Sequence, residues 1–368
     1  MAELDQITVA TKRWVRATPK LVDDIFQNDP LIAYAKTNCR EDYPGGRYIA
    51  ENFFYAGLIG GSYLPGKEFD ISEPQVEQQG QFIPKFFEVN VTLTKEEIQV
   101  INNGPEVIFS LIKSRTTNAY MTIGAHLALA AYLNGINANY TPNFNGLAEA
   151  LNDNTTASWD GNTYSTYGTL TRGGAIGPAL NSPPTNVSGT IEYPTLEETY
   201  GDASIGQIEP NVGLTTAKGY SFIKEKFQTQ QRFNDTQDPK IGFNGMRFND
   251  AVLMKSRYAP GSYLYGSSGT ADPNAVTYLK QMTAGAVTAY PAPSGGYPAA
   301  GVFNETLFWL NMRKPFFNFY MSSDPEYQFG ITGFKPAQGN TKVVAQVLFA
   351  GNITLHPRYH RQLYGISG

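Results

Sequence analysis

The sequence predicts an α+β protein built around one long helix, several long strands and a mixed region of short helices and strands. An apolar stripe at helical spacing covers residues 105–135. Apolar and polar residues alternate over residues 86–93 and again over residues 343–355, as expected for strands with one buried face. Residues 194–233 switch between short helical and strand patterns, which predicts a smaller region of α/β type.

The composition is poor in charge and rich in aromatic residues. Of the 368 residues, 16% are charged and 13% are aromatic, whereas soluble domains have about 25% charged residues. Protein interfaces are enriched in Tyr and Phe and depleted in Lys and Glu. The composition therefore fits a protein whose surface is largely covered by other copies. A β-rich domain with many Tyr-Gly-Asn loops is the alternative explanation.

Charge and cysteine content exclude several classes of protein. The formal net charge is −4, which does not suit bulk electrostatic capture of nucleic acid. The basic cluster Lys12, Arg13, Arg16 and Lys20 is interpreted as a solvated arm. The single cysteine, Cys39, rules out an intrachain disulfide. The beginning of the sequence lacks the apolar core of a secretory signal, and no run of 18 apolar residues suits a spanning helix. We expect a cytoplasmic location.

The first 93 residues predict a polar arm followed by a long β excursion. Residues 1–46 are expected to hold one short helix, which begins at Pro19. Residues 48–56 form the outgoing arm of the excursion, and residues 86–93 form its return arm. Residues 58–84 lie between them, with many glycines and prolines, and are too long for a hairpin turn. Loops of this length in compact domains are usually functional or disordered.

The long helix is expected to begin at Pro105, after a short helical turn opened by a capping box of Thr94 and Glu97. Gly135 closes it. At 1.5 Å per residue such a helix is about 45 Å long, which is typical of a structural spine. Its apolar stripe consists of Ile108, Leu111, Ile112, Ala119, Ile123, Leu127, Ala130 and Ala131.

The second half of the chain predicts shorter elements separated by two segments rich in Gly, Ser, Asn and Pro. The expected elements are a loop-dominated region at 136–190, helices at 194–204 and 217–233, strands at 211–216, 251–255 and 262–265, an inserted loop at 266–304, and strands at 306–313, 316–322, 327–334 and 342–355.

No catalytic or metal-binding set is found. His126 lies beside the apolar stripe of the long helix and is expected to pack there. His356 and His360 are four residues apart, but Pro357 between them argues against the helical face used by metal-binding pairs. The glycine run at 172–177 lacks the Lys-Ser/Thr ending of a phosphate loop. We therefore predict no catalytic residue, no cofactor, no metal and no enzymatic activity.

Four segments carry a resemblance to a known family. They are GGRYIAENFFYAGLIGGSY at 45–63, FFEVNVTLTKEEIQVINNGPEVIFSLIKSRTTNAYMTIGAHLALAAYLNG at 86–135, QRFNDTQDPKIGFNGMRFNDAVLMKSRYAPGSYLY at 231–265, and VVAQVLFAGNITLHPRYHRQLYGI at 343–366. In this order they resemble the extended loop (E-loop), spine helix, strand-rich middle and C-terminal strand of the major capsid proteins of tailed bacteriophages. That fold is shared with encapsulins and herpesvirus capsid floors.

The resemblance implies an α+β capsid fold with five regions. They are an N-terminal arm at 1–46, an E-loop at 47–93, a peripheral domain with the spine helix at 94–135, an axial domain at 136–320 with loop insertions at 136–190 and 266–304, and return strands of both domains at 321–368.

The resemblance also implies a structural function. Subunits of this family form hexamers and pentamers that tile an icosahedral shell around double-stranded phage DNA. The implied partners are further copies of the chain, a separate scaffolding protein, a portal and, in part of the family, a decoration protein. Packaged DNA would lie close to the shell without specific contacts, and no membrane is involved. We expect assembly in the host cytoplasm and a final location in the virion capsid.

The E-loop is expected to supply contacts between subunits. On this assignment Tyr63, Leu64, Lys67, Phe69 and Phe82 contact a neighbouring subunit. Family members that cross-link join an E-loop lysine to an asparagine of a neighbour, and Lys67 is near the loop tip. Many relatives lack this chemistry, so no cross-link is predicted. A long uncovered ribbon would be an aggregation hazard in a monomer, whereas in a closed shell it becomes a contact.

Two alternatives remain open at this point. An encapsulin has the same fold but forms a cellular compartment that holds an enzyme cargo. A β-rich carbohydrate-binding or hydrolytic protein would also be rich in Tyr, Asn and Gly. That second class should show paired carboxylates on strands and a secretion signal, and neither is visible in the sequence.

Overall fold

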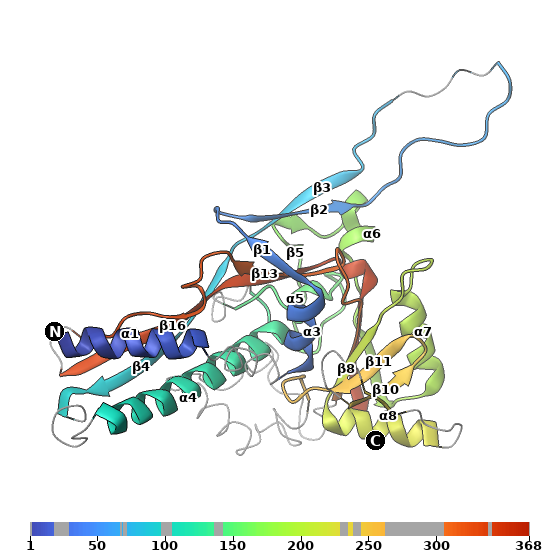
Figure 1. Cartoon of the computed structure of the whole chain (residues 1–368). Helices are drawn as coiled ribbons and strands as arrows, with labels where there is room; N and C mark the ends of the chain where they lie inside the picture. Colours follow the sequence, from blue (N-terminus) through green and yellow to red (C-terminus); the bar gives the residue numbers. More distant parts are fainter. Residues whose placement is uncertain are drawn as a thin grey trace.

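The structure is a computed structural model that describes residues 2–17, 29–66, 68, 72–96, 105–135, 143–228, 235–237, 244–261, 305–337 and 341–367. In this part of the chain the strands form a six-stranded sheet, a seven-stranded sheet and two two-stranded ribbons. Figure 1 shows a long helix along one side of the molecule and a ribbon that rises away from the other side. None of the described helices is long and apolar enough to cross a membrane.

The predicted spine is helix α4 (Pro105–Tyr132), which has 28 residues and is therefore about 42 Å long. The predicted stripe is buried where its side chains are described: Ile112, Ile123 and Leu127 have no exposed surface, and Leu111 is half-buried. The side chain of Ile108 lies outside the described residues. The predicted helix and its buried face are confirmed.

The six-stranded sheet is organised by its longest strand. β16 has 14 residues and pairs with β4 from Lys342–Thr94 to Gly351–Lys85. Their inward-facing residues pack with α4 in one core. The predicted alternation in β4 is confirmed, because Phe87, Val89, Val91 and Leu93 point inward and their neighbours outward. The strands are β1 (Arg40–Tyr43), β4 (Lys85–Thr94), β13 (Phe317–Ser322), β14 (Gln328–Ile331), β15 (Lys335–Pro336) and β16 (Lys342–Leu355).

The β excursion is paired differently from the prediction. Strand β2 (Ile49–Phe54) pairs with β3 (Glu77–Phe82), with Ile49 opposite Phe82 and Phe54 opposite Glu77. The expected return arm at 86–93 is instead part of β4, because its apolar face packs against the spine and its backbone pairs with β16. The loop between the paired strands is therefore shorter than the predicted 58–84.

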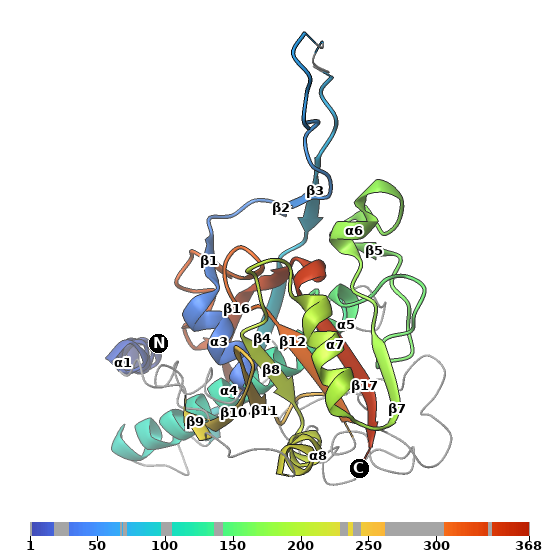
Figure 2. The same ribbon diagram turned by 90° about the vertical axis from the view of Figure 1, so that its right-hand side faces the viewer.

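The seven-stranded sheet forms the other half of the molecule and runs in the order β7-β17-β12-β8-β11-β10-β9. Helices α7 (Tyr193–Ala203) and α8 (Ala217–Gln228) pack on it around Trp309 and Phe248 (Figure 2). The last strand of the chain, β17 (Arg361–Ser367), was not predicted. The strands are β7 (Thr185–Thr190), β8 (Val212–Thr215), β9 (Asp235–Gln237), β10 (Asn244–Phe248), β11 (Ala251–Lys255), β12 (Glu305–Leu310) and β17 (Arg361–Ser367).

The last strands of the chain alternate between the two sheets. β12 belongs to the seven-stranded sheet, whereas β13 and β16 belong to the six-stranded sheet, and β17 returns to the seven-stranded one. The boundary expected at residue 320 falls inside β13. The predicted strand at 262–265 and the predicted loop at 266–304 lie outside the described residues.

Part of the N-terminal region is buried, although the sequence predicted a polar arm. Helix α1 (Ala2–Ala17) lies against the spine, where the amine of Lys113 sits 5.5 Å from the ring centre of Trp14. Helix α3 (Pro30–Asn38) is almost entirely buried. A continuous polar arm at 1–46 is therefore wrong, because α3 fills the space between the spine and the sheets. The helix expected after Pro19 lies outside the described residues, as does most of the turn expected at 94–97.

The described part of the region predicted to be loop-dominated, residues 143–190, packs into the core. Phe144, Leu147, Leu151 and Tyr167 have no exposed surface. The expectation of a loop insertion is wrong here, because these apolar side chains pack in one core with α4 and the six-stranded sheet. Its elements are α5 (Leu147–Ala150), β5 (Thr166–Tyr167), β6 (Leu170–Thr171), the 3-10 turn η2 (Gly174–Ile176) and α6 (Gly177–Leu180).

Two buried carboxyl groups tie the end of α4 to its surroundings. Asp29 caps α3 by accepting a hydrogen bond from the amide of Leu31 (3.1 Å), and it also accepts from the hydroxyls of Tyr132 (3.4 Å) and Ser256. Glu149 accepts from the amide of Gly135 at 3.0 Å. Burial raises the pKa of each carboxyl to about 7, because the charged form loses its water.

We expect Ile123→Asp to abolish soluble folding. An unpaired buried carboxylate costs several kcal/mol, which is a large part of a domain's stability of about 5–15 kcal/mol. Met121→Asp is the matched control, because Met121 is 51% exposed on the same helix. Circular dichroism and the soluble yield of both variants test the assignment of the buried face, and a folded Ile123→Asp variant would contradict it.

Asp29 gives the folded state a specific dependence on pH. Burial raises the pKa of Asp29 to about 7 in the folded state, well above the ordinary value of 3.8, so the folded state holds a proton that the unfolded chain releases. This stabilisation is complete below about pH 4 and is lost as pH rises to about 7. Asp29→Asn should flatten the change in unfolding free energy over this range, whereas Asp42→Asn, at an exposed ion pair with Arg40, should not. Denaturant unfolding from pH 4.5 to 8 gives the measurement, and equal slopes for Asp29→Asn and the wild type would refute the assignment.

Candidate assembly surface

The ribbon formed by β2 and β3 has one buried face and one exposed face. On the inner face Ile49, Phe53 and Phe82 are 3%, 0% and 1% exposed, and Gly80 is buried between them. Phe54 on the outer face is 65% exposed. This alternation follows from the period of a strand, so the base of the ribbon belongs to the core of its own subunit.

Tyr167 is the centre of the contact between ribbon and body. Its ring lies 5.0 Å from Phe82 and 6.3 Å from Phe53, edge to face in both cases, which is a favourable geometry for aromatic pairs. Its hydroxyl accepts a hydrogen bond from the amide of Leu355 at 3.0 Å. Tyr167 therefore joins the ribbon to the long strand β16.

Arg172 packs against the ring of Tyr167. Its guanidinium lies 5.6 Å from the ring centre of Tyr167. It donates to the carbonyls of Glu149 (2.7 Å) and Ala150 (2.9 Å), and also to the carbonyls of Asn152 and Leu180. Although burial lowers the pKa of Arg172 to about 10, the group stays charged at neutral pH. One buried side chain thus satisfies the carbonyl groups that end α5 and α6.

Glu51, on the same inner face, fixes strand β2 of the ribbon base. Its Oε1 accepts hydrogen bonds from the hydroxyls of Tyr320 and Thr354, both at 2.7 Å, and from the amide group of Asn318 at 2.9 Å. These partners come from β13 and β16. Hydrogen bonds to a charged group are stronger than neutral ones, so Glu51 attaches the ribbon to the six-stranded sheet.

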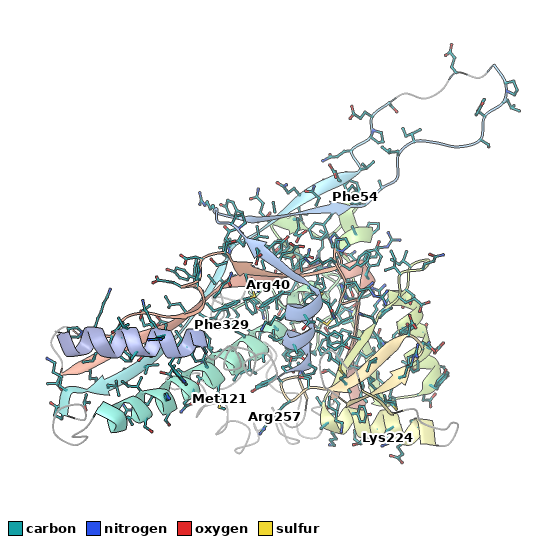
Figure 3. The ribbon with its side chains drawn as sticks, in the orientation of Figure 1. Arg40, Phe54, Met121, Lys224, Arg257 and Phe329 are labelled. Carbon is teal, nitrogen blue, oxygen red and sulfur yellow. The ribbon has the colours of Figure 1, made fainter. Side chains whose placement is uncertain are left out.

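Beyond the paired strands the loop is apolar and exposed. Leu58, Ile59, Tyr63 and Leu64 are 76%, 49%, 62% and 77% exposed. Figure 3 labels Phe54 where the ribbon leaves the body, and the loop extends further away from there. Residues 55–66, 68 and 72–76, called the apolar loop below, are the described part of the segment that joins β2 to β3.

The predicted contact residues divide into three groups. Tyr63 and Leu64 are on the apolar loop with most of their surface exposed. Lys67 and Phe69 lie outside the described residues. The prediction that Phe82 is buried by a neighbour is wrong, because the inner face of β3 places it against Tyr167 of its own subunit.

A second apolar patch lies on the outer face of the six-stranded sheet. Ile83 and Phe86 are 57% and 64% exposed, and Phe86 packs edge to face on the partly exposed Tyr327 at 6.2 Å. Between β4 and β16 the same face carries a polar ladder in which Gln346 donates to Asn90 at 3.0 Å. Large apolar side chains are thus exposed both on the ribbon and on the sheet beside it.

The histidines have structural roles. His360 accepts from the amide of Asn311 (3.0 Å) and lies 3.1 Å from the carbonyl of Phe316, and burial lowers its pKa to about 3. His356 packs on Phe53 at 4.9 Å. Burial also lowers the pKa of His126. Among the residues that the structure describes, no group of three or more His, Cys, Asp or Glu could hold a metal ion.

Sequence reasoning missed the residues that hold the ribbon in place. Glu51 could have been found from the alternation of Ile49 and Phe53 on the same face, whereas Gly80 lies in β3, whose polar sequence hides the strand. Tyr167 and Arg172 carry no pattern of their own in a segment rich in Asn, Thr and Gly. The role of Tyr167 depends on contacts with distant parts of the chain, and Arg172 acts on carbonyl groups within its own segment.

Comparison with known proteins identifies the fold. No protein-family model and no curated protein matches the sequence. The structure is similar to the capsid of cyanophage A-1(L), with a TM-score of 0.53 and 12% identity over 92% of this chain and 93% of that chain. It is also similar to the capsid of a native GTA particle (TM-score 0.51, 7% identity, 90% and 89% covered). A third similar structure is the SrpI encapsulin of Synechococcus elongatus PCC 7942 (TM-score 0.50, 9% identity, 90% and 86% covered). The predicted capsid fold is confirmed.

Truncation of Phe82 should destabilise the subunit, whereas truncation of Phe54 should not. Removing a fully buried phenylalanine costs about 3–5 kcal/mol, and Phe82 is 1% exposed. Phe54 is in the same ribbon with 65% exposure, so Phe54→Ala should leave the free energy of unfolding within about 0.5 kcal/mol of the wild type. Denaturant unfolding of dispersed subunits measures both values. Equal stabilities would show that the ribbon base is not part of the core.

Proposed function

We propose that this chain is the major capsid protein of a tailed bacteriophage. Subunits assemble as hexamers and pentamers into an icosahedral shell that encloses double-stranded DNA. The observation that carries the proposal is the apolar loop, which a ribbon fixed at its base holds away from its own body. The same fold in phage and GTA capsids supports it.

An isolated subunit leaves this apolar surface in water. Leu58, Tyr63 and Leu64 each keep more than half of their surface exposed. Large exposed apolar patches in soluble proteins usually mark interaction sites. A neighbouring subunit can bury these side chains without any change in the ribbon. The role is structural, with no reaction and no cofactor.

The proposed partners follow from a shell. They are further copies of the chain, a separate scaffolding protein, a portal and, optionally, a decoration protein. The net charge of −4 suits a wall that lies close to packaged DNA without trapping it, because tight binding to DNA needs concentrated Lys and Arg. Assembly takes place in the host cytoplasm, and the protein ends in the virion capsid.

We propose the following assignment of the regions of the capsid fold. The ribbon and the apolar loop form the E-loop. Helix α4 and the six-stranded sheet form the peripheral domain, and the seven-stranded sheet with α7 and α8 forms the axial domain. The expected arm at 1–46 is reduced to the residues before α3.

An encapsulin-like compartment is the second candidate. The similarity to the SrpI encapsulin over 90% of this chain favours it. A compartment of this kind would contain protein cargo, whereas a phage head would contain DNA protected from nuclease. The content of particles purified from the native source distinguishes the two. The fold gives no support to a carbohydrate-binding protein.

Replacing residues 55–76 with Asn-Gly should separate folding from assembly. The replacement joins Phe54 to Glu77, which are already paired, and Asn-Gly suits a two-residue hairpin turn. The variant should keep the circular dichroism and cooperative melt of the wild type but form no stable shells when expressed with its scaffolding protein. Negative-stain microscopy and light scattering of the same samples provide the readout.

Val9→Ser is the matched control for the loop replacement, because it removes an apolar side chain that is 66% exposed on α1, far along the chain from the loop. It should assemble as the wild type does. Normal shells from the loop variant would show that the loop is dispensable, and loss of the cooperative melt would place it in the core. Either result would refute the E-loop assignment.

A further inference from the structure

A small hairpin closes against the inner face of the ribbon. Strands β5 and β6 are joined by Gly168 and Thr169. The amide of Gln81 in β3 donates to the carbonyl of Gly168 at 2.7 Å, and the ring of Phe82 lies directly against Gly168. In both Figure 1 and Figure 2, β5 lies beside the base of the ribbon. The hairpin therefore limits how far the ribbon can lean toward it.

There is no spare room at this contact. A Cβ atom at Gly168 would lie 2.7 Å from Cε2 and 3.0 Å from Cε1 of Phe82. A Cβ atom at Gly80, on the ribbon side, would lie 3.2 Å from the carbonyl oxygen of Gly168 and 2.8 Å from Cε2 of Phe53. One glycine on each side thus allows the two backbones to approach closely.

The backbone conformation of the turn and the contacts of the residue before it hold the turn in place. Gly168 and Thr169 have φ values of +56° and +66°, the combination required by a type I′ turn of two residues. This region is unfavourable for a β-branched residue such as Thr169 and persists where the surroundings determine it. Tyr167, next to the turn, is held by the guanidinium of Arg172 and by the amide of Leu355. The hairpin is therefore a firm support.

A contact of this kind is needed to fix the angle between the ribbon and the body of the subunit. A two-stranded ribbon is marginally stable by itself, and its own ladder does not set its angle to the body. Glu51 attaches strand β2 to β13 and β16, and the Gly168 turn contacts strand β3 on the same inner face. A small change of angle at the base moves the apolar loop by a larger distance, because the loop is at the far end of the ribbon.

We propose that the Gly168 turn is a mechanical stop that sets the direction of the ribbon. Through that direction it determines where the apolar loop meets the next copy of the chain. The first statement concerns the subunit alone. The second rests on the proposed function, so the test measures the two separately.

The direction of the ribbon is measured in dispersed subunits by pulsed electron paramagnetic resonance between two spin labels. The labels are attached at Glu77→Cys, at the end of the paired ribbon, and at Glu198→Cys on α7, both exposed positions. Cys39 is fully buried, and burial raises the pKa of its thiol to about 12, so it does not take up label. Gly168→Ala should shift the mean distance and broaden its distribution.

The control variant is Gly174→Ala. Gly174 has φ +57°, against +56° for Gly168, but a Cβ atom there meets nothing within 4 Å. It introduces the same backbone strain without the contact, so its distance should equal that of the wild type. Adding Phe82→Leu to Gly168→Ala removes the ring that the new methyl group meets, and should return the distance toward the wild-type value.

The outcomes are distinct. A wild-type distance in Gly168→Ala, or an equal shift in Gly174→Ala, overturns the stop. If Gly168→Ala does not fold, Phe82→Leu alone is measured, and an unchanged distance there overturns the stop as well. A shifted distance in a variant that forms normal shells overturns the link to assembly. Failure of the wild type to form any shell counts against the proposed function and leaves the distance result standing.

Discussion

The burial of Phe53 and Phe82 against Tyr167 holds the ribbon on the body and thereby determines where the apolar loop lies. These rings fix one face of the ribbon to the body, and the alternation of a strand then turns Phe54 outward. The base is buried in the core, and the apolar loop beyond it is exposed on its own subunit. Its exposure follows from how the base is packed, so it is a property of the folded chain.

Buried polar groups make this packing possible. Arg172 satisfies carbonyls that would otherwise be unpaired in the core, and Asp29 and Glu149 tie the end of α4 to segments distant in the sequence. Isolated buried polar groups are costly, so each of these residues determines a particular arrangement of its neighbours. Together with Glu51 they connect the two sheets, the spine and the ribbon.

The sequence predicted what local periodicity controls and missed what distant contacts decide. Helix α4 and strand β16 have long, regular patterns and were found nearly to their ends. Strand β3 was missed because EQQGQF is polar and contains glycine, and its one buried aromatic was attributed to a neighbouring subunit. The core position of residues 143–190 could not be predicted, because Tyr167 contacts Phe53, Phe82 and Leu355, which are far along the chain. Tyr63 and Leu64 were predicted as contacts because the loop lacked any apolar periodicity.

The central claim is that the ribbon base is part of the folded subunit, whereas the apolar loop is covered only by another copy. Amide hydrogen exchange on dispersed subunits and on assembled particles tests it most directly, because exchange reports local opening segment by segment. We expect slow exchange of residues 49–54 and 77–82 in both states, and strong protection of residues 57–64 only after assembly. Protection of residues 57–64 in the dispersed subunit, or no change on assembly, would contradict it.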